Sequence, residues 1–222
     1  MLRDAAVVAA KDLRVELRSR VATNQVAPFA VLVLLLFGFA LDPDRGVLAR
    51  AAAGLFWLAV LFSALLAVQR SFAIEAEDGA RDGLRLAALD PAGIFLGKVA
   101  AVGAQLVALE VLLAVGVVVL YDVTLRGVVL LVATCVVATV GIAAAGTVYG
   151  VLAAGLRVRE TLLPLLLLPV LAPVLLGAAR ASEAAIGLGL DSGWRWVQLL
   201  AVFALVYVVF GVVAFGPLLE ET

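Results

Sequence analysis

The 222-residue sequence contains no histidine and a single cysteine. Histidine is the commonest metal ligand, the usual haem ligand and the usual general base, so its absence argues against all three roles in this chain. Cys135 stands alone in an apolar run, which excludes a disulfide within the chain and any CxxC pair. We therefore interpret Cys135 as a small buried apolar residue, and we expect no catalytic, cofactor-binding or metal-binding residues in the chain.

Charge is also scarce. Charged residues make up 15% of the chain and hydrophobic residues 65%, with a mean hydropathy of +1.20. A typical soluble domain has roughly 25% charged residues. The net charge of −1 argues against binding to nucleic acid. No cleavable signal peptide is expected, because the N-terminal segment carries too many charges for the n-region of a signal peptide.

Long apolar runs take up most of the remaining sequence. A helix needs about 20 apolar residues to cross the hydrocarbon core of a bilayer. Six runs approach or exceed this length, at residues 24–41, 51–69, 94–120, 127–154, 161–179 and 195–216. We predict an all-α polytopic membrane protein with one permease domain, residues 1–222, in which residues 24–216 form a bundle of six transmembrane helices.

Lysine and arginine residues predict the orientation, because they accumulate on the cytoplasmic side of membrane proteins. If the N-terminus is cytoplasmic, eleven of the 16 basic residues lie on that side, namely Arg3, Lys11, Arg14, Arg18, Arg20, Arg70, Arg81, Arg85, Lys98, Arg157 and Arg159. The outer side then has Arg45, Arg50, Arg126, Arg180 and Arg195. Six spans return the C-terminus to the cytoplasm.

Residues 1–22 are amphipathic. Apolar residues recur at helical spacing, and basic residues form a second stripe. The apolar stripe is Leu2, Ala6, Ala9, Leu13 and Leu17, and the basic stripe is Lys11, Arg14 and Arg18. We predict an interfacial helix on the cytoplasmic face with its basic side toward anionic headgroups. The alternative is a solvated helical extension.

The cytoplasmic segment 70–92 has the strongest local pattern. One helical face would carry Glu75, Asp78, Asp82 and Arg85, the other Phe72, Ala76, Ala80 and Leu84, and Glu77 with Arg81 form an i,i+4 ion pair. Such a helix suits insertion into a groove of a cytoplasmic protein. The alternative is an ordinary solvated helix. In the second cytoplasmic loop, Arg157, Arg159 and Glu160 form either a positive-inside anchor or a further partner contact.

Three features lie inside the spans. Glu110 is a carboxyl group deep in an apolar run, so it is either a substrate or proton site or a group that bonds a neighbouring helix. Gly146 and Gly150 form a GxxxG pair suited to close helix packing within or between protomers. Pro164, Pro169 and Pro173 predict a kinked helix, which either serves packing alone or flexes during transport.

One apparent nucleotide-binding motif is not a real match. Gly97-Lys98 is followed by Val99, and Ala92 occupies the position of the first glycine of a P-loop. The chain therefore lacks a Walker A sequence, and we expect it to have no ATPase site of its own.

Several segments together resemble the CcmB family of haem exporter proteins, which supply the membrane part of the cytochrome c maturation ABC transporter. They are Lys11 to Arg18, Gly54-Leu55-Phe56-Trp57-Leu58, Gln69-Arg70-Ser71-Phe72 with Glu75 and Asp78-Gly79, Gly146-Thr147 with Gly150, and Leu162-Leu163-Pro164 with Pro169 and Pro173. The resemblance covers nearly the whole chain. Asp90-Pro91, where the family often has a proline-rich pair of turns, and Gln69, often acidic there, depart from the family pattern.

The resemblance implies an ABC-2-like permease of the bacterial inner membrane for haem export or haem-chaperone release in c-type cytochrome biogenesis. It implies a second copy of the chain, a separate ABC ATPase subunit that uses ATP, a haem-handling membrane protein and a haem chaperone. Segment 70–92 would be the coupling segment that contacts the ATPase. The alternatives are an ABC-2 permease for a lipid, drug or polysaccharide and a non-transporting membrane scaffold for an assembly complex.

Overall fold

The computed structural model describes residues 1–222 except 20–23, 25, 42–44, 78–88, 155–158, 190, 221 and 222. Seven helices make up the described part. They are α1 (Leu2–Ser19), α2 (Ala27–Ala40), α3 (Arg45–Glu77), α5 (Pro91–Tyr121), α6 (Val128–Ala154), α7 (Arg159–Ala185) and α8 (Trp194–Glu220). No strand occurs among these described residues. The prediction of an all-α polytopic membrane protein is confirmed.

Five of the helices, α3 and α5 to α8, are long and apolar enough to cross a bilayer. The first predicted span is different, because α2 has only 14 residues. At 1.5 Å per residue it is about 21 Å long, against a hydrocarbon core of about 30 Å. The predicted ends of two other spans also differ, since α3 continues to Glu77 and α7 to Ala185.

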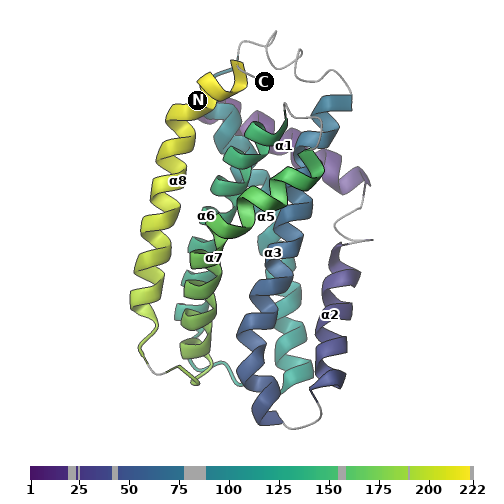
Figure 1. The fold of residues 1–222 in the computed structure, drawn as a ribbon, viewed down its shortest axis with the longest axis vertical. Coiled ribbons are helices and arrows are strands. Elements are labelled where there is room, and N and C mark those ends of the chain that lie inside the picture. The colour runs from purple at the N-terminus through teal and green to yellow at the C-terminus, as the bar shows by residue number, and fades with distance from the viewer. Residues whose placement is uncertain are drawn as a thin grey trace.

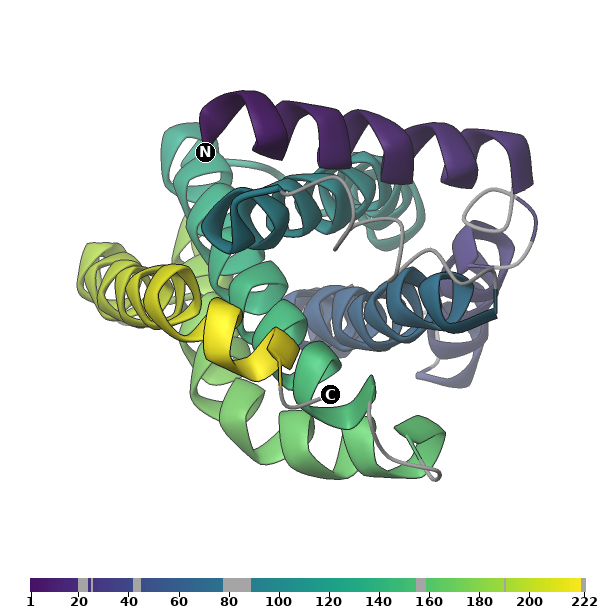
Figure 2. The same cartoon turned by 90° about the horizontal axis from the view of Figure 1, so that it is seen from above.

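The long helices alternate in direction, so successive connections lie at opposite ends of the bundle (Figure 1). Both labelled termini are at the upper end of this view, together with the end of α3 and the start of α5. Figure 2 looks onto that end and shows α1 running along one side of the bundle, across the direction of the other helices. We call the end of the bundle that carries α1 the α1 end, and the other end of the bundle the opposite end.

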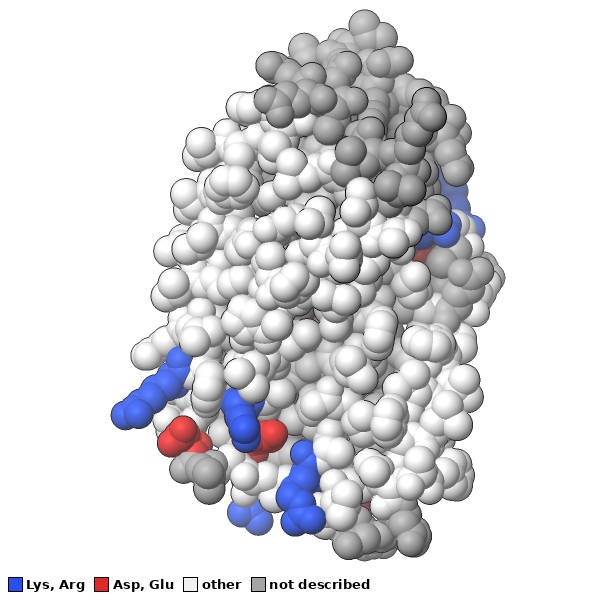
Figure 3. All heavy atoms as spheres, in the orientation of Figure 1, with Lys and Arg blue, Asp and Glu red and all other residues white. Residues whose placement is uncertain are grey.

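The surface agrees with a bilayer environment. On the face drawn in Figure 3, a broad band is free of charged side chains, and the blue and red atoms gather toward the edges of the molecule. Large apolar side chains project outward along the spans, with Val119 72%, Val129 73% and Val213 73% exposed. In lipid such exposure carries no hydrophobic penalty.

Two local sequence signals fix the start and course of helices near the α1 end. Asp90 caps α5, because its side chain accepts a hydrogen bond from the Ala92 backbone N–H, and Pro91 occupies the first turn. Pro164, Pro169 and Pro173 all lie inside α7. Figure 1 shows α7 crossing the bundle obliquely before it turns parallel to its neighbours, as expected of a proline-bent helix.

Candidate functional site

The two segments predicted to contact a partner include two helix ends at the α1 end, namely the end of α3 and the start of α7. Glu75 and Glu77 belong to the last two turns of α3, and Arg159 and Glu160 to the first turn of α7, although the positions of these side chains are not described. The remaining predicted contacts, Asp78, Arg81, Asp82, Arg85 and Arg157, lie outside the described residues. Their roles stay predictions.

Phe72 is part of α3 and is only 6% exposed. Its ring lies against α6, where a Cβ atom on Gly150 would clash with Phe72 Cε2. One turn earlier, a Cβ atom on Gly146 would be 2.7 Å from Val68 Cγ2. The GxxxG pair therefore seats α6 closely on α3 of the same chain. The Phe72 ring is buried here and does not lie on an exposed docking face.

Lys98 is the most unusual residue of the α1 end, because its charged side chain is 1% exposed. Its Nζ atom donates to Ser71 Oγ at 3.2 Å and lies 3.6 Å from Asp12 Oδ2. It also lies 4.6 Å from the centroid of the Phe72 ring, over the ring. One ammonium group thus joins α1, α3 and α5. A buried charge needs such partners, since an unpaired one costs several kcal/mol.

A second ion pair lies beside the first. Arg70 Nε in α3 is 3.3 Å from Glu16 Oε2 in α1, and both side chains are largely buried. In the first turn of α1, the Asp4 carboxylate accepts hydrogen bonds from the N-terminal ammonium and from the Asp90 backbone N–H. In that order, these two donors lower the pKa of Asp4 below its usual range. Acidic residues along one side of α1 therefore hold it to the bundle.

Two glycines of α5 let α1 approach closely. A Cβ atom on Gly93 would lie 2.9 Å from Met1 O, and one on Gly97 would lie 2.7 Å from Ala5 O. Val8 fills the contact and is 1% exposed. Gly97-Lys98, which is not a nucleotide-binding motif, thus has a structural use: the glycine admits α1 and the lysine pairs with it.

The sequence pattern did not predict the inward-facing side of α1. At the two ends of its apolar stripe, Leu2 and Leu17 are 80% and 75% exposed. However, Asp12 and Glu16 face the bundle rather than solvent. The available signal was the four-residue spacing of Asp4, Val8, Asp12 and Glu16, together with a lone lysine in the apolar sequence of α5.

Glu110 lies in α5 and is 3% exposed. The Thr139 hydroxyl of α6 donates a hydrogen bond to its Oε1 atom. The Cys135 thiol, one turn earlier in α6, is a second polar neighbour of the carboxyl group. This is the geometry expected of a carboxyl group that bonds a neighbouring helix, and it joins α5 to α6 inside the membrane.

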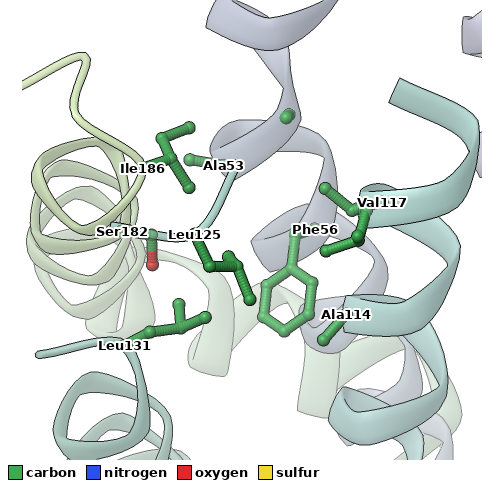
Figure 4. Close-up of a pocket in the computed structure, with 10 residues that line it drawn as sticks. Ala53, Phe56, Ala114, Val117, Leu125, Leu131, Ser182 and Ile186 are labelled. Carbon is green, nitrogen blue, oxygen red and sulfur yellow. The ribbon is translucent and has the colours of Figure 1, made fainter. Parts of the chain in front are cut away.

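A cavity of about 40 Å³ lies away from these contacts (Figure 4). It is lined by Ala52, Ala53, Phe56, Ala114, Val117, Val118, Leu125, Leu131, Ser182 and Ile186. The hydroxyl oxygen of Ser182 accepts a hydrogen bond of 2.9 Å from the Trp57 indole. With room for only a few water molecules and an apolar lining, it is a packing gap rather than a substrate site.

The sequence matches the profile of the family described as CcmB protein over residues 3–221. The chain belongs to the CcmB protein family. It is 31% identical to heme exporter protein B of Rhodobacter capsulatus over 186 residues, which are 82% of this chain and 84% of the relative. It is 32% identical to heme exporter protein B of Haemophilus influenzae over 196 residues, which are 86% of each chain.

A third relative, heme exporter protein B of Paracoccus denitrificans, is 31% identical over 180 residues, which are 77% of this chain and 78% of the relative. These alignments and the profile match extend over most of the membrane bundle of this CcmB family member. The family resemblance predicted from the ordered segments of the sequence is therefore confirmed.

Proposed function

We propose that this chain is the membrane permease subunit of an ABC transporter for haem export in c-type cytochrome biogenesis. The observation that supports this function is the CcmB profile match over residues 3–221, together with relatives named heme exporter protein B that align over most of their length. The chain itself is not an enzyme in this proposal. ATP is hydrolysed by a separate ABC ATPase subunit, and haem is handled by the complex.

The proposed assembly lies in the bacterial inner membrane with both termini of this chain in the cytoplasm. Figure 1 supports a common side for the termini, since both are at the α1 end. The exposed Arg14 and Arg18 of α1 suit contact with anionic headgroups there, beside the exposed Leu17. A second copy of the chain, a haem-handling membrane protein and a haem chaperone complete the proposed set of partners.

In the proposed mechanism, closure of the ATPase dimer pushes segment 70–92 and thereby moves the spans. The structure offers a mechanical basis, because α3 is continuous from Arg45 through the membrane to Glu77, where the coupling segment continues. A push on this end is therefore delivered directly to a spanning helix. Arg159 at the start of α7 would be a second point of contact with the ATPase.

Charge reversal in the coupling segment tests this function. Asp78→Lys with Asp82→Lys is expected to abolish cytochrome c maturation while the complex still hydrolyses ATP, since the charges would no longer fit the ATPase groove. Maturation is measured by haem staining of c-type cytochromes, and ATPase activity is measured on the purified complex. The control is Asp191→Lys, a reversal of an exposed charge before α8. Normal maturation by the normally expressed double variant would contradict the proposal.

A further inference from the structure

The contacts of Lys98 bring three helices together at one buried charge. Its ammonium group reaches Asp12 of α1 at 3.6 Å and Ser71 of α3 at 3.2 Å, while Lys98 itself belongs to α5. Because Lys98 is 1% and Asp12 13% exposed, water screens this pair little.

Stability alone does not account for a lysine at this position. Replacing a buried ion pair by apolar side chains of similar volume is often neutral or stabilising, because both charges must be stripped of water. The surrounding sequence of α5 is apolar, and Val99 and Ala101 are also buried. An apolar residue at 98 would fill the same space. The charge therefore points to a requirement for a defined arrangement of the three helices.

The position of the Lys98–Asp12 pair shows that this arrangement concerns the end of α3. Lys98 contacts two successive residues of α3, Ser71 and Phe72, which lie near its end at Glu77. The Phe72 ring also presses on Gly150, one turn before α6 ends at Ala154. The two helices that lead into the proposed partner-contacting loops are thus in contact through Phe72, and Lys98 holds that ring from α5.

We propose that Lys98 and Asp12 form an ionic joint that positions the end of α3 on α1 and α5. Movement of the coupling segment is transmitted through this joint to both helices, so α1 belongs to the moving unit rather than to a passive anchor. This inference rests on the proposed function, because it assigns a route for motion that begins at the ATPase. Lys98 and Asp12 are positioning residues and contact neither ATP nor haem.

The experiment compares four variants in the full complex. Asp12→Asn removes the carboxylate charge beside the buried Lys98 ammonium, and Lys98→Met leaves the Asp12 carboxylate with Lys11 beside it. The double variant Asp12→Asn/Lys98→Met removes both charges of the pair together. The matched control is Lys11→Met, which removes the half-exposed lysine 3.1 Å from the same Asp12 carboxylate. Membrane abundance, ATPase rate and cytochrome c maturation are measured for each, and maturation is expressed per ATP hydrolysed.

The double variant separates positioning from stability. We expect its abundance to return to about that of the wild type while maturation per ATP stays roughly tenfold lower, since the volume is kept and the joint is lost. Lys11→Met is expected to match the wild type in all three measurements. Recovery of maturation together with abundance in the double variant would overturn the proposal, because the pair would then serve stability alone.

A milder variant covers the case in which the double variant does not accumulate. Ser71→Ala removes only the hydroxyl that accepts from Lys98 Nζ, on a half-buried residue. It is expected to lower maturation per ATP roughly threefold at normal abundance, and an unchanged ratio would count against the joint. If the wild-type chain still supports maturation beside an ATPase that cannot hydrolyse ATP, the proposed function itself is refuted.

Discussion

The two ends of the bundle join their helices by different chemistry. At the α1 end, buried ion pairs cross between helices, Lys98 with Asp12 and Arg70 with Glu16. Away from that end, neutral hydrogen bonds do so. Trp57 of α3 donates to Ser182 of α7, and the backbone N–H groups of Arg126 and Gly127 both donate to the Ala185 carbonyl where α7 ends.

This difference indicates where the molecule is suited to movement. The attraction between two charges falls only slowly with distance, so an ion pair persists through shifts of a fraction of an ångström. A neutral hydrogen bond weakens steeply as its angle departs from linear. We infer that the ion pairs keep the helices of the α1 end joined while they move together, and that the neutral contacts hold α3 and α7 at a fixed distance.

The largest effect is expected from crowding the contact between α1 and α5. Gly97→Val would place Cβ 2.7 Å from both the Ala5 carbonyl oxygen and Val8 Cβ, and a backbone atom cannot rotate away. We expect a loss of about 2–3 kcal/mol in the free energy of unfolding and detachment of α1. Denaturant titration in detergent and protease sensitivity of residues 1–19 measure these changes.

The control for this variant is Gly54→Val in α3, where a Cβ atom would meet no atom within 4 Å. This substitution is expected to change the free energy of unfolding by less than about 0.5 kcal/mol. Equal effects at Gly97 and Gly54 would show that α1 is not held by close packing on α5.

An intermediate effect is expected at the bond between α5 and α6. Thr139→Val keeps the shape of the side chain but removes the hydroxyl that donates to Glu110 Oε1, so the buried carboxyl group keeps only the Cys135 thiol as a polar neighbour from α6. We expect a loss of about 1–2 kcal/mol in the free energy of unfolding in detergent. Thr134→Val is the matched control, since that hydroxyl bonds only the Leu130 carbonyl of its own helix. Similar losses for both would contradict an interhelical role for Glu110.

The smallest effect is expected at the neutral contact between α3 and α7. Ser182→Ala removes the acceptor of the Trp57 indole N–H, at a cost of about 1 kcal/mol in the free energy of unfolding. Cytochrome c maturation per ATP is expected to stay normal, unlike in the Lys98 variants. Ser63→Ala is the control, because its hydroxyl bonds the Ala59 carbonyl one turn back in α3. If Ser182→Ala lost maturation at normal abundance, the neutral contact between α3 and α7 would matter for transport as the α1 end does, and the proposed difference between the two regions would be wrong.

Five of the six predicted spans correspond to long apolar helices, and they were predictable because apolar runs of about bilayer length have few other stable structures. The end of α3 was not, since Phe72 reads as the first apolar residue of a separate amphipathic helix. In the structure its contacts with Gly150 and Lys98, both distant in sequence, keep it in the spanning helix. A local pattern contains no information on such partners.

The same limit applies to the charged residues. Asp12 and Glu16 have the spacing of a solvated helix face, and only the positions of Lys98 and Arg70 in the folded chain turn that face inward. For Glu110, the cost of burying a carboxyl group indicated a bond to a neighbouring helix, but Thr139 could not be selected in advance among several hydroxyl groups. Long-range pairs between polar groups therefore could not be predicted from the sequence pattern.

The most direct test of the proposed function is purification of the chain from native membranes in mild detergent, with the bound proteins identified by mass spectrometry. We predict that a small ABC ATPase and a haem-handling membrane protein are recovered with it. Recovery of the chain without any ATPase would contradict the assignment of segment 70–92 as a coupling segment and, with it, the transporter function.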